Sequence, residues 1–175
     1  MAFLVRKLNK RDNIDIIGTA TDIDKLYADA PTGEFRTKEG TLSTWFIDSL
    51  DSLDEAVLAM VVTSNQITRM DFAIIDTKIL DNNGLKYKQT YAGEDIAVPD
   101  LQDTHYDILG ITIHKLINCA KVFKEVYEQD NDQEQYIVRY VEGEIKELLN
   151  KAYSDNRIEM SKLNKGIKKG LNIVG

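Results

Sequence analysis

The segment 70–80 (MDFAIIDTKIL) constrains the fold most, because its centre is apolar on both faces. It is the strongest strand candidate in the chain. Segments 2–8 and 41–47 also read as strands, and the second is rich in β-forming residues. Asn82-Asn83-Gly84 signals a turn of the kind that joins hairpin strands, and it predicts a further strand over 85–91. The lysines of that strand suit a sheet edge that faces water.

Two helices are predicted near these strands. Apolar residues recur at spacings of four, three and four within 14–29, which indicates a helical face, and Pro31 closes that helix. Ser52 followed by Glu55 forms a capping box ahead of an apolar run, which predicts a largely buried helix over 52–64. The strands and helices together predict a small mixed sheet with helices packed on it.

The region that follows predicts a long antiparallel helical hairpin. Apolar residues step by alternating spacings of four and three through 104–128 and again through 131–154. The first helix also carries apolar residues away from this seam, at Ile108, Ile111 and Ile117. Its apolar surface is therefore wider than one partner helix needs, and we expect the extra surface to cover the sheet or another protein. The predicted fold class is α+β, with one domain over 1–156.

The net charge of −7 is unevenly distributed along the chain. Residues 1–104 carry 11 basic and 18 acidic side chains, whereas residues 105–175 carry 11 of each. An acidic body repels phosphate backbones, so we expect direct contact with nucleic acid only through the basic tail over 157–175. That tail allows two interpretations, a frayed end or a segment that orders against a partner. Its candidate contact residues are Leu163, Lys165, Ile167, Lys168 and Lys169.

The sequence predicts a cytoplasmic protein without a membrane partner. Cys119 is the only cysteine, so no internal disulfide can form. The first residues do not combine a basic segment with a long apolar one, as a signal peptide does. No apolar run approaches the roughly 18 residues that a membrane-spanning helix needs.

The sequence contains neither of the common nucleotide-binding motifs and no nucleophile elbow. We therefore expect no cofactor, and a binding protein is favoured over an enzyme. The loop 33–40 is predicted to be exposed, and loops held by a scaffold often carry binding residues. Phe35, Arg36 and Lys38 are the candidates for partner contact in this loop.

One segment, 100–107 (DLQDTHYD), could carry metal chemistry. Asp100, Asp103 and His105 are residue types that bind metals, and they would lie at a predicted helix start. That interpretation predicts a small metal-dependent hydrolase or nuclease. In the competing interpretation, Asp103 or Thr104 caps the helix, and the acids favour the positive end of its dipole. A further alternative is an acidic inhibitor that imitates nucleic acid, which requires carboxylates along one exposed face.

A resemblance to a known family lies in the first two thirds of the chain. It is carried by Phe35-Arg36-Thr37-Lys38, Leu42-Ser43-Thr44-Trp45, the helix over 52–64 and the strand over 70–80. These features resemble small bacterial accessory proteins encoded beside an SMC-like ATPase and an effector nuclease, in Lamassu-type and related three-component anti-phage operons. The resemblance implies a non-catalytic third subunit that docks on the ATPase or the effector and holds it in check.

Overall fold

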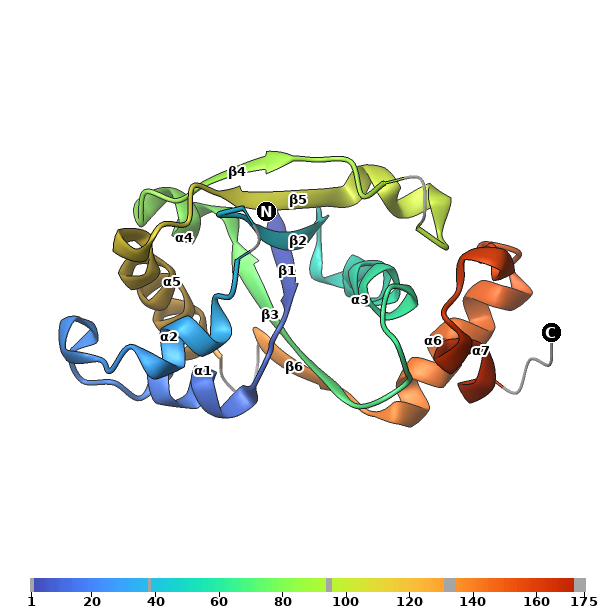
Figure 1. Ribbon diagram of the computed structural model, residues 1–175, viewed down its shortest axis with the longest axis horizontal. Coiled ribbons are helices and arrows are strands. Elements are labelled where there is room, and N and C mark those ends of the chain that lie inside the picture. The colour runs from blue at the N-terminus through green and yellow to red at the C-terminus, as the bar shows by residue number, and fades with distance from the viewer. Residues whose placement is uncertain (1, 38, 94–95, 131–134, 172–175) are drawn as a thin grey trace.

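A six-stranded antiparallel sheet runs through the middle of the molecule, with helices on both of its faces (Figure 1). The computed structural model describes residues 2–37, 39–93, 96–130 and 135–171. The strand order is β4-β5-β2-β1-β3-β6. The strands are β1 Phe3–Lys7, β2 Leu42–Ile47, β3 Met70–Asp76, β4 Lys86–Gln89, β5 His105–Leu109 and β6 Ile137–Tyr140. The predicted α+β class is confirmed, but the predicted mixed sheet is wrong, because each strand pair among the described residues is antiparallel.

The central strand β1 is buried on both faces. It pairs with β2 on one side and with β3 on the other, so that Val5 lies between Trp45 and Ile74. Leu4 and Val5 are both fully buried, although consecutive side chains of a strand point to opposite faces. A strand of this kind needs an apolar layer on each side of the sheet.

Each face of the sheet has its own helical layer and its own hydrophobic core (Figure 1). The face to which Val5 points is covered by α3 (Leu53–Val62), α6 (Glu142–Ser154) and α7 (Lys165–Gly170). The face to which Leu4 points is covered by α1 (Arg11–Gly18), α2 (Asp29–Glu34), α4 (Thr77–Asn82) and α5 (Leu116–Gln129). Short 3-10 helices occur at η1 Ile23–Lys25, η2 Leu50–Ser52, η3 Pro99–Thr104, η4 Ile113–Lys115 and η5 Met160–Lys162. Within the described ranges, no helix combines the length and the apolar character that crossing a bilayer requires.

The predicted helical hairpin over 104–128 and 131–154 is wrong. Its first segment begins with strand β5, and its second segment contains strand β6. Gly110 follows β5 with a φ of +67°, a conformation that favours glycine and that lies outside the α-helix. The two remaining helices, α5 and α6, lie on opposite faces of the sheet (Figure 1). Residues 131–134, which were predicted to begin the second helix, lie outside the described residues.

The spacing of apolar residues misled because a strand followed by a helix can offer the same apolar positions as one long helix. Ile108 of β5 and Ile111 after it belong to the core that α5 also covers. In addition, β5 forms main-chain hydrogen bonds with both β2 and β4. A helix in this place would leave the edge of the mostly buried strand β2 unpaired inside the protein. Pairing across the sheet therefore determined the structure of this segment.

Two other boundaries differ from the prediction. The helix expected over 14–29 is the shorter α1, and Pro31 lies inside the separate helix α2. Strand β3 ends at Asp76, whose carboxylate accepts a hydrogen bond from the backbone N–H of Lys78 at 2.9 Å and so caps α4. Asn82-Asn83-Gly84 closes α4 instead of joining β3 to β4, and β4 pairs with β5. The elements predicted near 2–8, 41–47, 52–64 and 85–91 are confirmed. The predicted capping box of the helix over 52–64 is wrong, because the Ser52 hydroxyl donates to Asp48 Oδ1 at 3.2 Å and does not cap α3.

The basic tail folds onto the α3 side of the domain over residues 157–171. Leu163 and Ile167 are buried in the core that α3 covers. Helix α7 approaches the loop after α3 so closely that a Cβ at Gly166 would lie 1.9 Å from the carbonyl oxygen of Asn65. Glycine is needed here because the backbones of two segments meet.

Replacement of Gly166 by alanine should destabilise the fold, because the added methyl would collide with backbone and not with a flexible side chain. We expect Gly166→Ala to lower the free energy of unfolding by about 1–3 kcal/mol. Gly143→Ala in α6 is the matched control, since a Cβ there meets nothing within 4 Å. That control should gain up to about 1 kcal/mol from helix propensity. Urea unfolding measures both, and an unchanged stability of Gly166→Ala would contradict the docking of α7.

Candidate functional site

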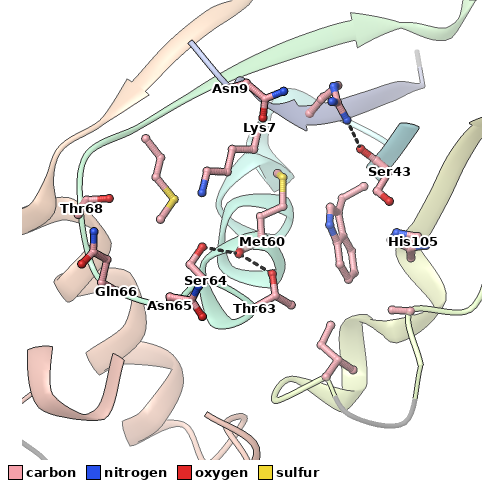
Figure 2. Close-up of a pocket in the computed structure, with 15 residues that line it drawn as sticks. Lys7, Asn9, Ser43, Met60, Thr63, Ser64, Asn65, Gln66, Thr68 and His105 are labelled. Atoms are coloured by element: carbon pink, nitrogen blue, oxygen red, sulfur yellow. Dashed lines mark hydrogen bonds between the residues drawn. The ribbon is translucent and has the colours of Figure 1, made fainter. Parts of the chain in front are cut away.

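A cleft of about 720 Å³ opens at one end of the sheet, on the face that α3 covers. We call it the sheet-end cleft. Its walls come from β1, β2 and β5, and from the C-terminal end of α3 with the loop that follows (Figure 2). Lys7 points from the end of β1 into this cleft, toward the loop that carries Ser64, Asn65 and Gln66 (Figure 2). The volume lies within the range of small-molecule sites.

The strand register brings polar side chains to this end of the sheet. Ser43 of β2 lies opposite Asp107 of β5, and Trp45 lies opposite His105. Residues two apart on a strand share a face, so these four side chains are on the same side as α3. Trp45 is buried and belongs to the core below the cleft. The cleft therefore has an apolar floor with polar groups around it.

Several polar groups of the sheet-end cleft have no partner within the described part of the chain. The side chains of Asn65, Gln66 and Thr68 form no hydrogen bond there, and Lys7 forms no ion pair. The side chain of Lys7 is exposed to solvent. The walls of the cleft nevertheless remove part of the water around its ammonium group, and this loss of hydration lowers its pKa. These amide, hydroxyl and ammonium groups are all able to donate hydrogen bonds to a ligand.

His105 is the only histidine of the cleft, and a short hydrogen-bond chain fixes its ring. The hydroxyl of Thr90 donates to Asp107 Oδ2 at 3.0 Å and lies 2.8 Å from His105 Nδ1. The hydroxyl has one hydrogen, which it uses in the bond to Asp107, so it can only accept a hydrogen bond from the ring. Nδ1 therefore carries the ring hydrogen and donates it to the oxygen of Thr90. Burial lowers the pKa of His105. The hydroxyl of Ser43 also bonds to this carboxylate, since it donates to Asp107 Oδ1 at 3.2 Å.

A buried polar pair lies behind the cleft. Arg6 lines the cleft from β1 and is 8% exposed; its guanidinium donates to the carbonyl oxygens of Ser43 at 3.1 Å and Glu34 at 3.4 Å. The Nε atom of Arg6 has no hydrogen-bond partner among the described residues. The carboxylate of Glu34 is fully buried and accepts hydrogen bonds from the backbone N–H groups of Asn9, at 2.9 and 3.1 Å, and Lys10, at 3.1 Å. Glu34 therefore fixes the chain between β1 and α1.

The predicted partner-contact residues are divided between core and surface. Phe35 is 2% exposed and packs against Phe123, with ring centroids 4.9 Å apart, so the expected exposed position is wrong. Leu163 and Ile167 are buried, and they hold the tail in place. Three basic residues, Arg36, Lys165 and Lys169, are exposed, and Lys168 is half-buried. Lys38 lies outside the described residues.

The candidate metal ligands do not converge. The carboxylate of Asp100 accepts hydrogen bonds from Arg157 at 2.7 and 2.9 Å, and His105 bonds to Thr90. Asp103 is exposed, and its carbonyl oxygen accepts a hydrogen bond from Gln89 at 2.6 Å. Across the part of the chain that the structure describes, no three such side chains form a group suited to a metal ion. The capping interpretation also fails, because 99–104 is a 3-10 helix that leads into β5 instead of an α-helix.

The sequence interpretation missed Lys7 and the loop residues of the cleft. The loop segment 63–68 (TSNQIT) is a polar stretch between the buried helix α3 and the buried strand β3. That contrast is a signal for an exposed functional loop. No comparable sequence pattern marks Lys7, because this residue reaches the cleft only through the pairing of β1 with its neighbouring strands. Comparison with known proteins adds no relative: no protein-family model, curated protein or solved structure matches this chain.

The hydrogen bond between Thr90 and His105 should affect the titration of the ring. Burial lowers the pKa of His105 below its ordinary value of 6.5, while the charge of Asp107 and a hydrogen bond to the backbone of Thr90 raise it. We expect Thr90→Val to lower the pKa further, because the hydroxyl that accepts from Nδ1–H is lost. Thr63→Val, at another threonine of the cleft, is the control and should leave the titration unchanged. Histidine resonances followed by NMR against pH test this, and a higher pKa in Thr90→Val would contradict the assigned chain.

Burial of Glu34 should make the stability of the fold depend on pH. Loss of hydration raises the pKa of this carboxyl above its ordinary value of 4.5, against the lowering effect of the Asn9 and Lys10 hydrogen bonds. The folded protein therefore binds a proton more readily at this site than the unfolded chain does. Its contribution is fully present below the unfolded pKa and is lost as the pH rises through the folded pKa.

The comparison of wild type with Glu34→Gln isolates this contribution. We expect the free energy of unfolding of wild type, relative to Glu34→Gln, to fall as the pH rises from about 4 through the folded pKa of Glu34. Urea unfolding of both proteins at a series of pH values measures the difference. An increase of that difference with pH would mean that the hydrogen bonds outweigh the burial.

Proposed function

We propose that this chain is a non-catalytic binding subunit of a larger protein complex, with the sheet-end cleft as its ligand site. The observation that supports this most is the group of free donors in the cleft. Asn65, Gln66 and Thr68 have no hydrogen-bond partner within the described residues, and Lys7 has no ion pair. These exposed side chains are hydrated, and a ligand in the cleft can replace the water that they bind.

The arrangement of the potentially catalytic side chains favours a binding protein over an enzyme. The Ser43 hydroxyl donates to Asp107 and not to His105, so these residues do not form a nucleophile and its base. Cys119 is buried in the α5 layer, and burial raises the pKa of its thiol to about 12, which keeps it protonated at neutral pH. We therefore assign a structural role to His105 and Asp107, which shape the wall of the cleft.

In this proposal the complex is the one that the family resemblance implies, with an SMC-like ATPase and an effector nuclease. The apolar surface of α5 is used inside the protein, where it covers the sheet and packs on α1. Large exposed apolar side chains are scattered over separate elements, for example Ile16 on α1, Ile113 in η4 and Tyr153 on α6. Docking would therefore rely on polar contacts, for which the exposed Lys165 and Lys169 are candidates. A stable contact of this kind buries about 1,200–2,000 Å².

Co-expression with the proteins encoded beside it tests this proposal. We expect a complex of defined mass in size-exclusion chromatography with light scattering. The double variant Lys165→Glu, Lys169→Glu should weaken the complex by about tenfold or more, because it reverses two charges at the contact. The matched control is Lys78→Glu with Lys86→Glu, which changes the same charge on α4 and β4. A chain that stays monomeric and captures neither neighbour would contradict the proposed role.

A further inference from the structure

A second hollow of about 790 Å³ continues the sheet-end cleft. Lys7, Asn9, Thr68 and Met70 line both hollows, so the two meet along the ends of β1 and β3. The second hollow extends from there to the start of α1 and to Arg139 on β6. We call this second hollow the basic lobe.

Most of the charge in the basic lobe is positive and part of it is unpaired. Arg11 forms an ion pair with Asp15 at 3.2 Å, and Arg139 forms one with Asp71 at 2.7 Å. The remaining cations of the lobe are Lys7, Lys10 and Arg69; within the described residues none of them forms an ion pair, and Asp12 is the acid left opposite them. This excess of positive charge occurs on a protein whose net charge is −7. Such a local field attracts anions to the lobe.

The sheet-end cleft offers a different kind of contact. Its floor contains Trp45, Met60 and Ile96, which are buried apolar residues. The free amides of Asn65 and Gln66 stand at its wall (Figure 2). An amide side chain both donates and accepts, so it can pair with the edge of a flat heterocycle such as a nucleobase. The two hollows together therefore fit a ligand with an anionic end and a planar polar end.

We propose that the joined hollows bind a nucleoside phosphate, with its phosphate groups in the basic lobe and its base in the sheet-end cleft. Lys10 and Arg69 contact the phosphates, Lys7 bridges the two halves, and Gln66 contacts the base. This proposal rests on the proposed function only in treating the cleft as a ligand site. The same chemistry is present in a free nucleotide and in the end of a single-stranded nucleic acid, and the experiment separates these sources.

Trp45 is the only tryptophan of the chain and lines the cleft, so its fluorescence reports binding without a label. The probes are the four nucleoside 5′-monophosphates and triphosphates, the uncharged nucleosides, inorganic phosphate, a short single-stranded oligonucleotide and a poly-glutamate peptide. Thermal unfolding with each probe is the second readout, because a ligand of the folded state raises Tm whether or not it changes fluorescence.

We expect saturable binding of at least one nucleotide, with its nucleoside and inorganic phosphate each about tenfold weaker or more. Arg69→Gln and Lys10→Gln should each weaken nucleotide binding about tenfold, and added salt should weaken it further. Gln66→Ala should weaken nucleotide binding without changing phosphate binding. Lys78→Gln on α4 removes the same charge outside both hollows and should bind like wild type. Tighter binding of the oligonucleotide than of any nucleotide would assign the ligand to a nucleic acid strand end.

Three results would overturn the proposal: no response to any nucleotide or oligonucleotide in either readout, inorganic phosphate or poly-glutamate binding as tightly as the best nucleotide, or wild-type affinity in Arg69→Gln. Lys10 and Arg69 are exposed, so their variants are expected to fold, and circular dichroism checks this. Capture of a neighbouring protein by co-expression does not depend on the hollows. A chain that still captures a neighbour but binds no nucleotide therefore removes this inference and leaves the proposed function standing.

Discussion

Strand β1 forms main-chain hydrogen bonds with β2 and with β3, and its side chains point alternately into two separate cores. A fully buried central strand is stable only when both faces of the sheet are covered, because each exposed face would leave a row of apolar side chains in water. This requirement explains why helices lie on both faces of the sheet. Helices α3, α6 and α7 cover one face, while α1, α2, α4 and α5 cover the other.

This arrangement accounts for the apolar surface of the C-terminal half. Two long helices packed on one another would have left a broad apolar face on the first of them. In the structure the two helices are separated by the sheet, and the strands β5 and β6 extend that sheet on either side. The apolar residues of α5 cover the sheet and contact α1. A partner of this protein would therefore meet a mostly polar surface.

The hollows at the strand ends follow from the same architecture. Where β1 ends at Lys7, the chain turns toward α1, and the buried carboxylate of Glu34 fixes that turn through the backbone of Asn9 and Lys10. On the other side, α7 packs against the loop after α3, which carries Asn65 and Gln66. Both walls of the cleft are thus held by contacts between residues far apart in the sequence. Its polar groups stay free because the protein fixes the backbone and not their side chains.

The local sequence pattern was enough to predict the elements whose apolar and polar residues by themselves indicate a strand or a helix. The apolar strand β3, the buried helix α3 with its preceding polar start, and the lysine-rich edge strand β4 belong to this group. The polar loop after α3 also marked itself in the sequence, although its neighbours in the cleft did not.

Only the tertiary structure decided whether the segment from His105 to Leu109 would be helix or strand. Its apolar residues fit both, and the choice came from hydrogen bonds to β2 and β4, which are distant in sequence. The same holds for the cleft, where Lys7, Trp45, Gln66 and His105 come from four separate elements or loops. Apolar spacing is a property of one segment, whereas strand pairing and burial depend on what the other segments leave uncovered. For this protein the sequence determined which residues could be core, and the packing of the sheet determined which of them share a site.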